Sequence, residues 1–446
     1  MKPSVKMLIV AGALAATTAV GYAQLRTYTP AEVLGTPTGQ TLLQALTVVD
    51  QIALKPVERE KLLEGAIKGM LATFEDPYTR YVAPVEAARD AEDQQGEFFG
   101  IGVTFVAADA NGNGGRIEGV YKGGAAEKAG VRPGDVFLKI DGQDVSKIPQ
   151  NEIVGKVRGK EGVPVKITFG RGEGSYEVTM TRARVTIVSV QSTVLPGNVG
   201  YVALNDFSNL KVLQQFPQVF ADFKAKGIDK VVFDLRDNPG GNLCVSTAVV
   251  DQFLSSGDIM KVRMRGGEAG SVECPGAGKA SNQATDYKGK LVVLTNGGSA
   301  SASEITAGAL QDAGRAQIVG EKTFGKGVVQ VVQPLVNGGR AHITFEEWLT
   351  PKGRSINKEG IKPNVQVADT RYPKIVTYSG TGVQPGQKVT VTIGERKLET
   401  TADAEGKFTF AESPKPRVVP AGDGQAIVDL KTDAQLAKAL EVINAK

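Results

Sequence analysis

The amino-acid sequence predicts a multidomain protein that combines α+β and α/β folds. A chain of 446 residues is too long for one ordinary hydrophobic core, so several modules are expected. Residues 97–184 form short β-rich runs between Gly, Asp and Pro turns, as in a small β domain. Residues 185–368 alternate apolar strands with helical segments, which is typical of an α/β domain. An N-terminal helical region and a small C-terminal β-rich module complete the predicted architecture.

The first 23 residues have the pattern of a signal peptide. Lys2 and Lys6 precede an apolar run over residues 7–20, and Gly21-Tyr22-Ala23 places small residues three and one positions before a cut. The mature chain would then begin near Gln24. The run is short for a membrane span of about 20 residues, but an uncleaved membrane anchor stays open as the alternative. We therefore expect an exported protein of the periplasm or cell envelope.

Residues 24–96 are predicted to form a helical region. One face of the segment 40–75 carries four apolar residues at helical spacing, namely Leu63, Ile67, Met70 and Phe74. Such a stripe is typical of a core or of a contact between two copies of a chain. Asp76-Pro77 ends the segment, because the residue before a proline is driven out of the helical region. A homo-oligomer formed through these helices is therefore one expectation.

Single strands can be placed inside the later modules. The β domain is expected to have strands at residues 101–106, 136–140, 165–169 and 176–180. The α/β domain is expected to have buried strands at 230–235 and 291–295. Beyond residue 369, alternating apolar residues predict strands at 389–393 and 408–410, and a final short helix carries Leu436, Leu440 and Ile443.

The composition excludes one broad class of function. The chain carries 52 basic and 48 acidic residues, a net charge of +4, and no basic stripe of the kind that holds nucleic acid. No nucleic-acid partner is predicted. The two cysteines, Cys244 and Cys274, could pair in an oxidising compartment, and two unpaired thiols are an equal alternative.

Three short motifs have the spelling of known sites but lack an essential residue. Residues 109–114 open like an EF-hand loop, but the twelfth position is Val120, where calcium needs a bidentate Glu. Residues 320–327 read G-x-x-x-x-G-K and end on Gly327, without the hydroxyl that would hold Mg²⁺. Ser208–Lys211 has an S-x-x-K spelling, but no S-D-N or K-T-G follows it. No metal and no other cofactor is predicted.

The single histidine narrows the catalytic chemistry. His342 lies in an alternating strand pattern, where a structural histidine is usual, so a serine hydrolase here would rather use lysine as its base. Ser301 lies in a small-residue turn before a helix, whose free N–H groups and dipole would stabilise an oxyanion. The spacing of Ser301 and Glu304 also suits an ordinary N-cap. A second oxyanion donor could come from the loop Asn238–Gly241, where glycine lets the backbone approach a substrate closely.

Lys326, between two glycines, is the candidate base. To accept a proton from Ser301 it must be neutral, so burial must lower its pKa by roughly three units from about 10.4. Gln330 would share a face with Lys326 in a straight strand but lie about 13 Å away, so contact requires a bend. Asp312 would lie about 16 Å from Ser301 along the helix axis, and we expect it to be a structural partner rather than a member of a triad.

Together these residues resemble the C-terminal processing, or tail-specific, peptidase family. The resemblance extends from about Gly65 to Val367. Its landmarks are Asp76-Pro77-Tyr78-Thr79, Phe99-Gly100-Ile101-Gly102-Val103, Gly123-Gly124-Ala125-Ala126, Pro133-Gly134-Asp135, Asp234–Gly241, Ser299–Ile305, Gly320–Gly327 and Thr350–Arg354. It implies a PDZ-like β domain at 97–184 and a ClpP/crotonase-like α/β protease core at 185–368. Residues 369–446 remain as a β-rich extension with a final helix.

The resemblance also implies the roles of single residues. In that family the middle serine of the S-A-S-A-S run is the nucleophile, the lysine of T-F-G-K-G is the base, and the glutamine four residues later orients the lysine. These positions are Ser301, Lys326 and Gln330. The oxyanion hole implied by the same comparison consists of the backbone N–H groups of Ala302 and of Gly240 or Gly241.

A peptide-binding loop is implied at the start of the β domain. The loop consists of Gly100, Ile101, Gly102 and Val103, whose amides would hold a C-terminal carboxylate while the peptide adds as a strand. Arg171, near the end of that domain, could signal peptide occupancy to the protease core. The expected partners are protein or peptide substrates with free C-termini.

The sequence favours an exported serine endopeptidase that captures substrate tails and cleaves through an acyl-enzyme. A non-catalytic envelope scaffold that only binds C-termini is the alternative from another class, and the intact Ser301, Lys326 and Gln330 count against it. A thioesterase or amidase with the same dyad is a third hypothesis.

Overall fold

The structure is a computed structural model that describes residues 28–445 with gaps. The gaps are residues 109–112, 122, 133, 172–173, 265–266, 268, 271, 273, 275, 277, 372–376, 394–395, 404, 412–423 and 427. The predicted signal peptide and most of the EF-hand-like stretch lie outside the described residues. No helix within the described ranges is long and apolar enough to cross a membrane. The chain forms two compact units, the first of residues up to Gly96 with Val194–Gln366, the second of Glu97–Thr193 with the residues from Val367 onward.

The first unit contains a parallel sheet, helices beside it and a separate antiparallel hairpin. Its N-terminal elements are α2 (Pro30–Leu34), α3 (Pro37–Ile52), α4 (Arg59–Ala72), β1 (Arg80–Val82) and α5 (Pro84–Gln94). Its later elements are β11 (Val199–Leu204), α8 (Val212–Ala225), β12 (Lys230–Asp234), α9 (Leu243–Asp251), β13 (Lys261–Met264), β14 (Lys290–Thr295), α10 (Ala302–Asp312), β15 (Gln317–Gly320), β16 (Val328–Pro334), β17 (Arg340–Leu349) and β18 (Val365–Gln366). Strand β10 (Val190–Leu195) spans the division between the units.

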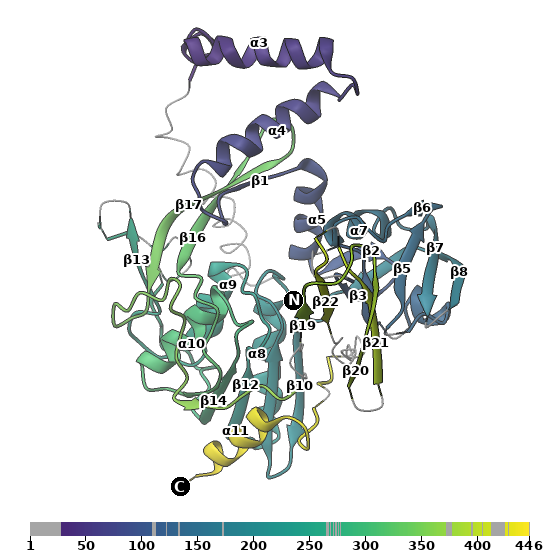
Figure 1. Cartoon of the computed structure of the whole chain (residues 1–446). Coiled ribbons are helices and arrows are strands. Elements are labelled where there is room, and N and C mark those ends of the chain that lie inside the picture. The colour runs from purple at the N-terminus through teal and green to yellow at the C-terminus, as the bar shows by residue number, and fades with distance from the viewer. Residues whose placement is uncertain are drawn as a thin grey trace. The chain divides into compact units, whose positions relative to one another are not determined.

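The parallel sheet has the strand order β11-β12-β14-β15-β18. Strands β11, β12 and β14 are buried along nearly their whole length, which explains their continuous apolar sequences. Helices α8, α9 and α10 lie beside these strands (Figure 1). Phe216 of α8 packs on Phe233 of β12, with ring centroids 5.1 Å apart, and Phe253 closes the same aromatic cluster. The α/β pattern expected from the sequence is observed here.

The N-terminal helices differ from the expectation of one helical segment over residues 40–75. Helix α3 ends at Ile52 and α4 begins at Arg59. Pro56 lies in the break, because proline has no N–H group to donate and its ring clashes with the preceding turn. The predicted single helix is therefore two helices joined by a short non-helical segment.

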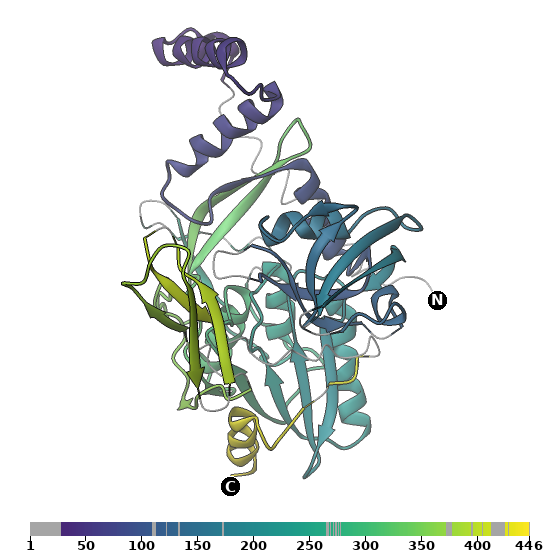
Figure 2. The same cartoon turned by 45° about the vertical axis from the view of Figure 1, so that its right-hand side comes forward.

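A hairpin of β16 and β17 joins the sheet region to α4. Strand β17 pairs antiparallel with β16 and with β1, where Arg80 faces His342. Leu71 of α4, Tyr81 and Ala341 form a small core there, and the hairpin extends toward α4 (Figure 2). Of the predicted apolar stripe, Ile67 packs against this core, whereas three side chains are exposed: Leu63, Met70 and Phe74.

The second unit begins with the small β domain. Its elements are β2 (Glu97–Gly100), β3 (Val103–Val106), β4 (Arg116–Val120), α6 (Ala125–Lys128), β5 (Val136–Ile140), β6 (Gln143–Asp144), α7 (Gln150–Val157), β7 (Pro164–Arg171), β8 (Gly174–Thr181) and β9 (Ala183–Thr186). The main sheet has the order β3-β4-β5-β7-β8. Alternating side chains of β7 point into a core with Phe137 and Ile117, and the buried ones are Val165, Ile167 and Phe169. The predicted strand at 101–106 starts only at Val103, because Gly102 takes a positive φ of 76°.

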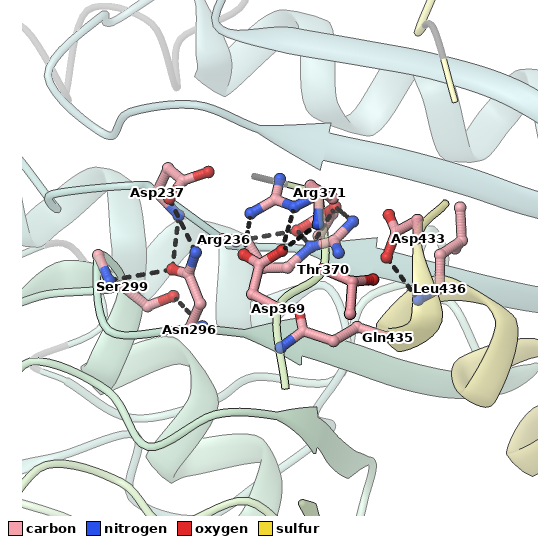
Figure 3. A network of polar contacts seen from close by, with 12 residues as sticks. Arg236, Asp237, Asn296, Ser299, Asp369, Thr370, Arg371, Asp433, Gln435 and Leu436 are labelled. Carbon is pink, nitrogen blue, oxygen red and sulfur yellow. Dashed lines mark hydrogen bonds and ion pairs between the residues drawn. The ribbon is translucent and has the colours of Figure 1, made fainter. Parts of the chain in front are cut away.

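The C-terminal part of the second unit contains short hairpins and a final helix, as expected. Its elements are β19 (Thr377–Gly380), β20 (Lys388–Ile393), β21 (Arg396–Thr401), β22 (Phe408–Ala411) and α11 (Ala434–Asn444). Strand β19 pairs with β22, and β20 pairs with β21. Asp433 caps α11, because its Oδ1 accepts from the Leu436 N–H at 2.9 Å (Figure 3).

Candidate active site

Three neighbouring strands of the parallel sheet bring the predicted residues to one edge. Strand β12 ends at Asp234 and leads into the loop with Gly240 and Gly241, β14 ends at Thr295 and leads to Ser301, and β15 ends at Gly320 and leads to Lys326. The carboxyl ends of parallel strands face the same way, which is why binding sites form there. Residues far apart in the sequence therefore share one edge.

Ser301 starts α10 in a conformation that is rare for a residue with a side chain. Its φ is 56° and its ψ is −114°, a region whose strain costs about 1–3 kcal/mol and is common at active sites. The other two serines of the run are fully buried. Ser299 Oγ donates to the Leu235 carbonyl at 2.8 Å, and Ser303 Oγ donates to the Asn238 carbonyl at 2.9 Å. Ser301 is half-buried and its Oγ donates to no described residue, so it is the serine of the three that is available for chemistry.

The glycine loop lies directly against Ser301. A Cβ on Gly240 would lie 2.8 Å from Ser301 Cβ and 2.9 Å from the Ala302 nitrogen, so only glycine fits. The N–H of Gly240 donates to Asn238 Oδ1 at 2.9 Å and is engaged. Within the described part of the chain, the N–H groups of Gly241 and Ala302 donate to no protein atom. Of the predicted oxyanion donors, Gly241 and Ala302 are thus the two whose N–H groups have no acceptor among the described residues.

Asn296 holds the two loops together. Its Oδ1 accepts from the Asp237 N–H at 2.9 Å, and its Nδ2 donates to Asp237 Oδ1 at 2.8 Å. The Asn296 N–H also donates to Ser299 Oγ at 3.0 Å. Figure 3 shows these contacts from Asn296 toward both loops. The glycine loop and the serine turn are therefore fixed relative to each other by side-chain hydrogen bonds.

A buried glutamate joins the serine turn to the lysine loop. Glu304 is fully buried, and its Oε2 accepts from the backbone N–H groups of Ser301 and Lys326, each at 2.8 Å. Its Oε1 accepts from Thr323 Oγ1 at 2.5 Å and from the Gly325 N–H at 2.7 Å. One carboxylate thus receives four donors, and the backbones of Ser301 and Lys326 are neighbours because they share one oxygen atom.

The Lys326 side chain is half-buried and lies over an aromatic ring. Its Nζ is 4.7 Å from the centroid of the Tyr78 ring, a cation–π distance. Burial, followed by the charge of Arg80, lowers the pKa of the Lys326 amine, while Asp76 and Glu304 oppose the shift. A lowered pKa is the direction that a general base of this kind requires.

The structure does not join the three predicted polar side chains by hydrogen bonds. Across the described residues, none links Lys326 Nζ to Ser301 Oγ or to Gln330. Gln330 Nε2 lies 3.5 Å from the Val328 carbonyl oxygen instead. The bend that Gln330 requires is present as a register irregularity between Val329 and Gln330 in the β16–β17 ladder. The three side chains thus lie on adjoining segments without hydrogen bonds to one another.

Other residues singled out from the sequence have structural environments. A disulfide joins Cys244 of α9 to Cys274. Asp312 accepts from Arg354 at 2.5 Å and from the Lys352 N–H at 2.9 Å, so it is a structural partner, as expected. His342 lies on β17 opposite Arg80, and its Nε2 is buried without a hydrogen bond to any described residue. No cluster of three metal-binding side chains occurs among the residues that the structure describes.

The predicted peptide-binding loop lies in the second unit, at the start of β3. Within the described chain, the N–H groups of Ile101 and Gly102 donate to no protein atom, as carboxylate capture requires. A groove of about 520 Å³ borders Gly100 and lies between α6, β8 and β9. Arg171 is engaged inside this domain, because its Nε donates to Asp135 Oδ1 at 2.7 Å and a terminal nitrogen donates to the Gly130 carbonyl at 2.8 Å.

Glu304 and Tyr78 are the two site residues that the sequence interpretation missed. Glu304 was read as an N-cap partner, yet it is the one charged residue in the buried segment 302–310, and that isolation was a signal. Tyr78 belongs to a recognised motif, but nothing in the sequence places its ring beside Lys326.

Comparisons with known proteins agree with the motifs. Residues 198–367 match the profile of Peptidase family S41, residues 116–171 that of a PDZ domain, and residues 23–84 that of the Activating protease CtpB N-terminal domain. The PDZ match falls inside the β domain of the second unit.

Relatives of this chain are proteases of one kind. The chain is 30% identical over 409 residues to the Carboxy-terminal processing protease CtpA of Bacillus subtilis (strain 168), covering 86% of this chain and 85% of that protein. It is 35% identical over 315 residues to a Probable CtpA-like serine protease of Staphylococcus haemolyticus (strain JCSC1435), covering 71% of this chain and 62% of that protein.

A solved structure of a photosystem II D1 C-terminal processing protease has 28% identity and a TM-score of 0.48, with 82% of this chain and 93% of that chain covered. The assignment rests on the sequence matches, which confirm the resemblance carried by the motifs. The chain belongs to the family of carboxy-terminal processing serine proteases, peptidase family S41.

Proposed function

We propose that the chain is a serine endopeptidase in which Ser301 is the nucleophile, Lys326 the general base and Gln330 the residue that orients the lysine. One observation carries the proposal. Ser301, with a hydroxyl that donates to no described residue, and Lys326, with a lowered pKa, have their backbones held by the same buried carboxylate of Glu304. This arrangement supports a dyad of Ser301 and Lys326.

The mechanism follows from these positions. When neutral Lys326 reaches Ser301, it takes the hydroxyl proton as Oγ attacks a peptide carbonyl. The N–H groups of Gly241 and Ala302 stabilise the developing oxyanion, and the Lys326 ammonium returns its proton to the leaving amine. Water then attacks the acyl-enzyme with Lys326 as base again. Each step uses groups of this chain and a water molecule.

Intact-mass analysis of an unfolded protein substrate tests the proposal. Wild-type protein is expected to release defined fragments, and Ser301→Ala and Lys326→Ala are expected to lower kcat by more than about 1000-fold. Lys322→Ala is the matched control, because Lys322 is an exposed lysine on the same loop. Fragments of equal yield from Ser301→Ala would exclude the mechanism.

We also propose that substrate C-termini dock on the loop Gly100–Val103. The free N–H groups of Ile101 and Gly102 support this. A substrate that ends in a carboxamide should be cleaved more slowly than the same substrate with a free carboxylate. Equal rates for the two would contradict the docking proposal and leave the dyad proposal intact.

The same assay separates the alternatives. A non-catalytic scaffold would bind free C-termini and release no fragments. A thioesterase or amidase would hydrolyse small esters or amides and leave polypeptides uncut. Small esters are therefore tested beside the protein substrate.

Export and self-association complete the proposal. Residues 1–23 are proposed to be a signal peptide that directs the chain to the periplasm or cell envelope. The exposed apolar side chains of α3, among them Leu42, Val49 and Ile52, support a homo-oligomer through the N-terminal helices. Sedimentation velocity should detect it, and Val49→Asp should dissociate it; a monomeric wild-type protein would exclude it.

A further inference from the structure

The Tyr78 ring lies in a turn that is fixed independently of the three loops described above. Asp76 Oδ1 accepts from the Tyr78 N–H at 3.1 Å, and Asp76 Oδ2 accepts from Thr79 Oγ1 at 2.8 Å. Thr79 Oγ1 in turn accepts from the Thr344 N–H of β17 at 3.0 Å. The turn is thus attached to the hairpin, and the ring has a defined position.

The backbone of Lys326 is held on both sides. Its N–H donates to Glu304 Oε2 at 2.8 Å, and its carbonyl accepts from Trp348 Nε1 at 3.0 Å. Trp348 is buried. The peptide groups of Lys326 are therefore fixed, and the flexible four-carbon side chain is the part that can move. The side chain can therefore reorient while the backbone stays in place.

The Lys326 amine contacts the Tyr78 ring and makes no hydrogen bond to Ser301 in the described structure. Lys326 Nζ lies 4.7 Å from the Tyr78 ring centroid, and no described residue bridges it to Ser301 Oγ by a hydrogen bond. An aromatic face attracts the ammonium form much more strongly than the neutral amine. The ring therefore selects the protonation state in which Lys326 cannot act as a base.

We propose that Tyr78 is a positioning residue that holds the Lys326 ammonium apart from Ser301, so that the dyad forms only when the amine loses its proton and leaves the ring. This inference rests on the proposed function. The charged groups around the amine are Asp76 and Arg80 from the turn and β1 and Glu304 from α10, and the titratable His342 lies on β17. Replacement of the ring by an apolar leucine side chain keeps these groups and withdraws a contact that stabilises the ammonium form.

The test compares pH profiles of kcat/KM for the full chain and two variants. Tyr78→Leu removes the ring, so the acid limb should move to lower pH by about 0.4 to 1.5 units, the shift that a cation–π contact of ordinary strength produces. On the acid limb, Tyr78→Leu should therefore be about 3- to 30-fold more active than wild type. Tyr78→Phe keeps the ring, so its acid limb should lie at the same pH as that of the wild type.

A second measurement does not depend on peptide hydrolysis. The rate at which a fluorophosphonate labels Ser301 is measured over the same pH range, with circular dichroism melts to show that each variant is folded. An acid limb of Tyr78→Leu that stays in place or moves to higher pH overturns the inference, as does a Tyr78→Phe limb that moves with Tyr78→Leu. Wild-type protein that neither cleaves nor is labelled overturns the proposed function instead.

Discussion

At the scale of single residues, the surroundings of Lys326 set the protonation of a second group, His342. Burial, then the charges of Arg80, Arg340 and Lys326, lower the pKa of His342 to about 4. The side chain is half-buried, and its Nε2 finds no partner in the described structure. The imidazole is therefore neutral near pH 7, and it adds no positive charge beside Lys326.

His342 gives a direct test of this environment because it is the single histidine of the chain. Its NMR signals should titrate with a midpoint of about 4. Between that pH and about 6.5 the unfolded chain binds a proton that the folded chain does not, so stability is lost as the pH falls through this window. Urea unfolding of His342→Gln at pH 7 and pH 5 should show a smaller loss than wild type. A midpoint near 6.5, or equal losses, would contradict the expectation.

At the scale of elements, the site depends on three loops that pack without space for extra atoms. Gly240 contacts Ser301 and Ala302 so closely that its missing Cβ is a requirement. Ser301 precedes α10 with a strained, positive φ. Asn296 fixes the serine turn to the glycine loop. The positions of the proposed oxyanion donors therefore depend on the contacts between these loops.

The close packing of Gly240 against the serine turn predicts what a methyl group at this position would do. Gly240→Ala would place a Cβ 2.7 Å from the Ala300 carbonyl oxygen and displace the donors, so kcat should fall by about 100-fold or more. Gly297→Ala is the control on the neighbouring turn, because a Cβ there meets nothing within 4 Å. Steady-state hydrolysis measures both variants, with thermal melts to show folding. A Gly240→Ala enzyme as active as Gly297→Ala would refute the argument.

At the scale of the whole molecule, each compact unit has a hydrophobic core of its own. Phe137 is fully buried in the second unit, and Phe233 is fully buried in the first. Separate cores imply separate cooperative units in unfolding, because two-state behaviour is a property of single domains.

Calorimetry should therefore resolve two transitions. Phe137→Ala should lower one of them and Phe233→Ala the other, each by an amount equivalent to about 3–5 kcal/mol of unfolding free energy. The two variants serve as controls for each other. A single transition that both variants lower equally would show that the units unfold together.

The sequence predicts elements well where one local signal dominates. Strand β5 occupies residues 136–140 as expected, because alternating apolar residues lie between turns. The helical segment 40–75 was wrong in its continuity, because Pro56 outweighs the periodicity around it. Ser301 and Lys326 are predicted from their motifs, whereas the contact of Tyr78 with Lys326 joins segments far apart in the chain. Such contacts depend on tertiary packing, and local sequence patterns do not predict them.

The cross-link between Cys244 and Cys274 has a consequence for where the molecule acquires its final form. Helix α9 begins at Leu243, immediately after the glycine loop, so the cystine anchors the segment that follows Gly241. Thiols stay reduced in the cytosol and pair in oxidising surroundings. A chain in reducing surroundings therefore lacks this anchor, and oxidation of the two thiols adds a covalent step to its maturation.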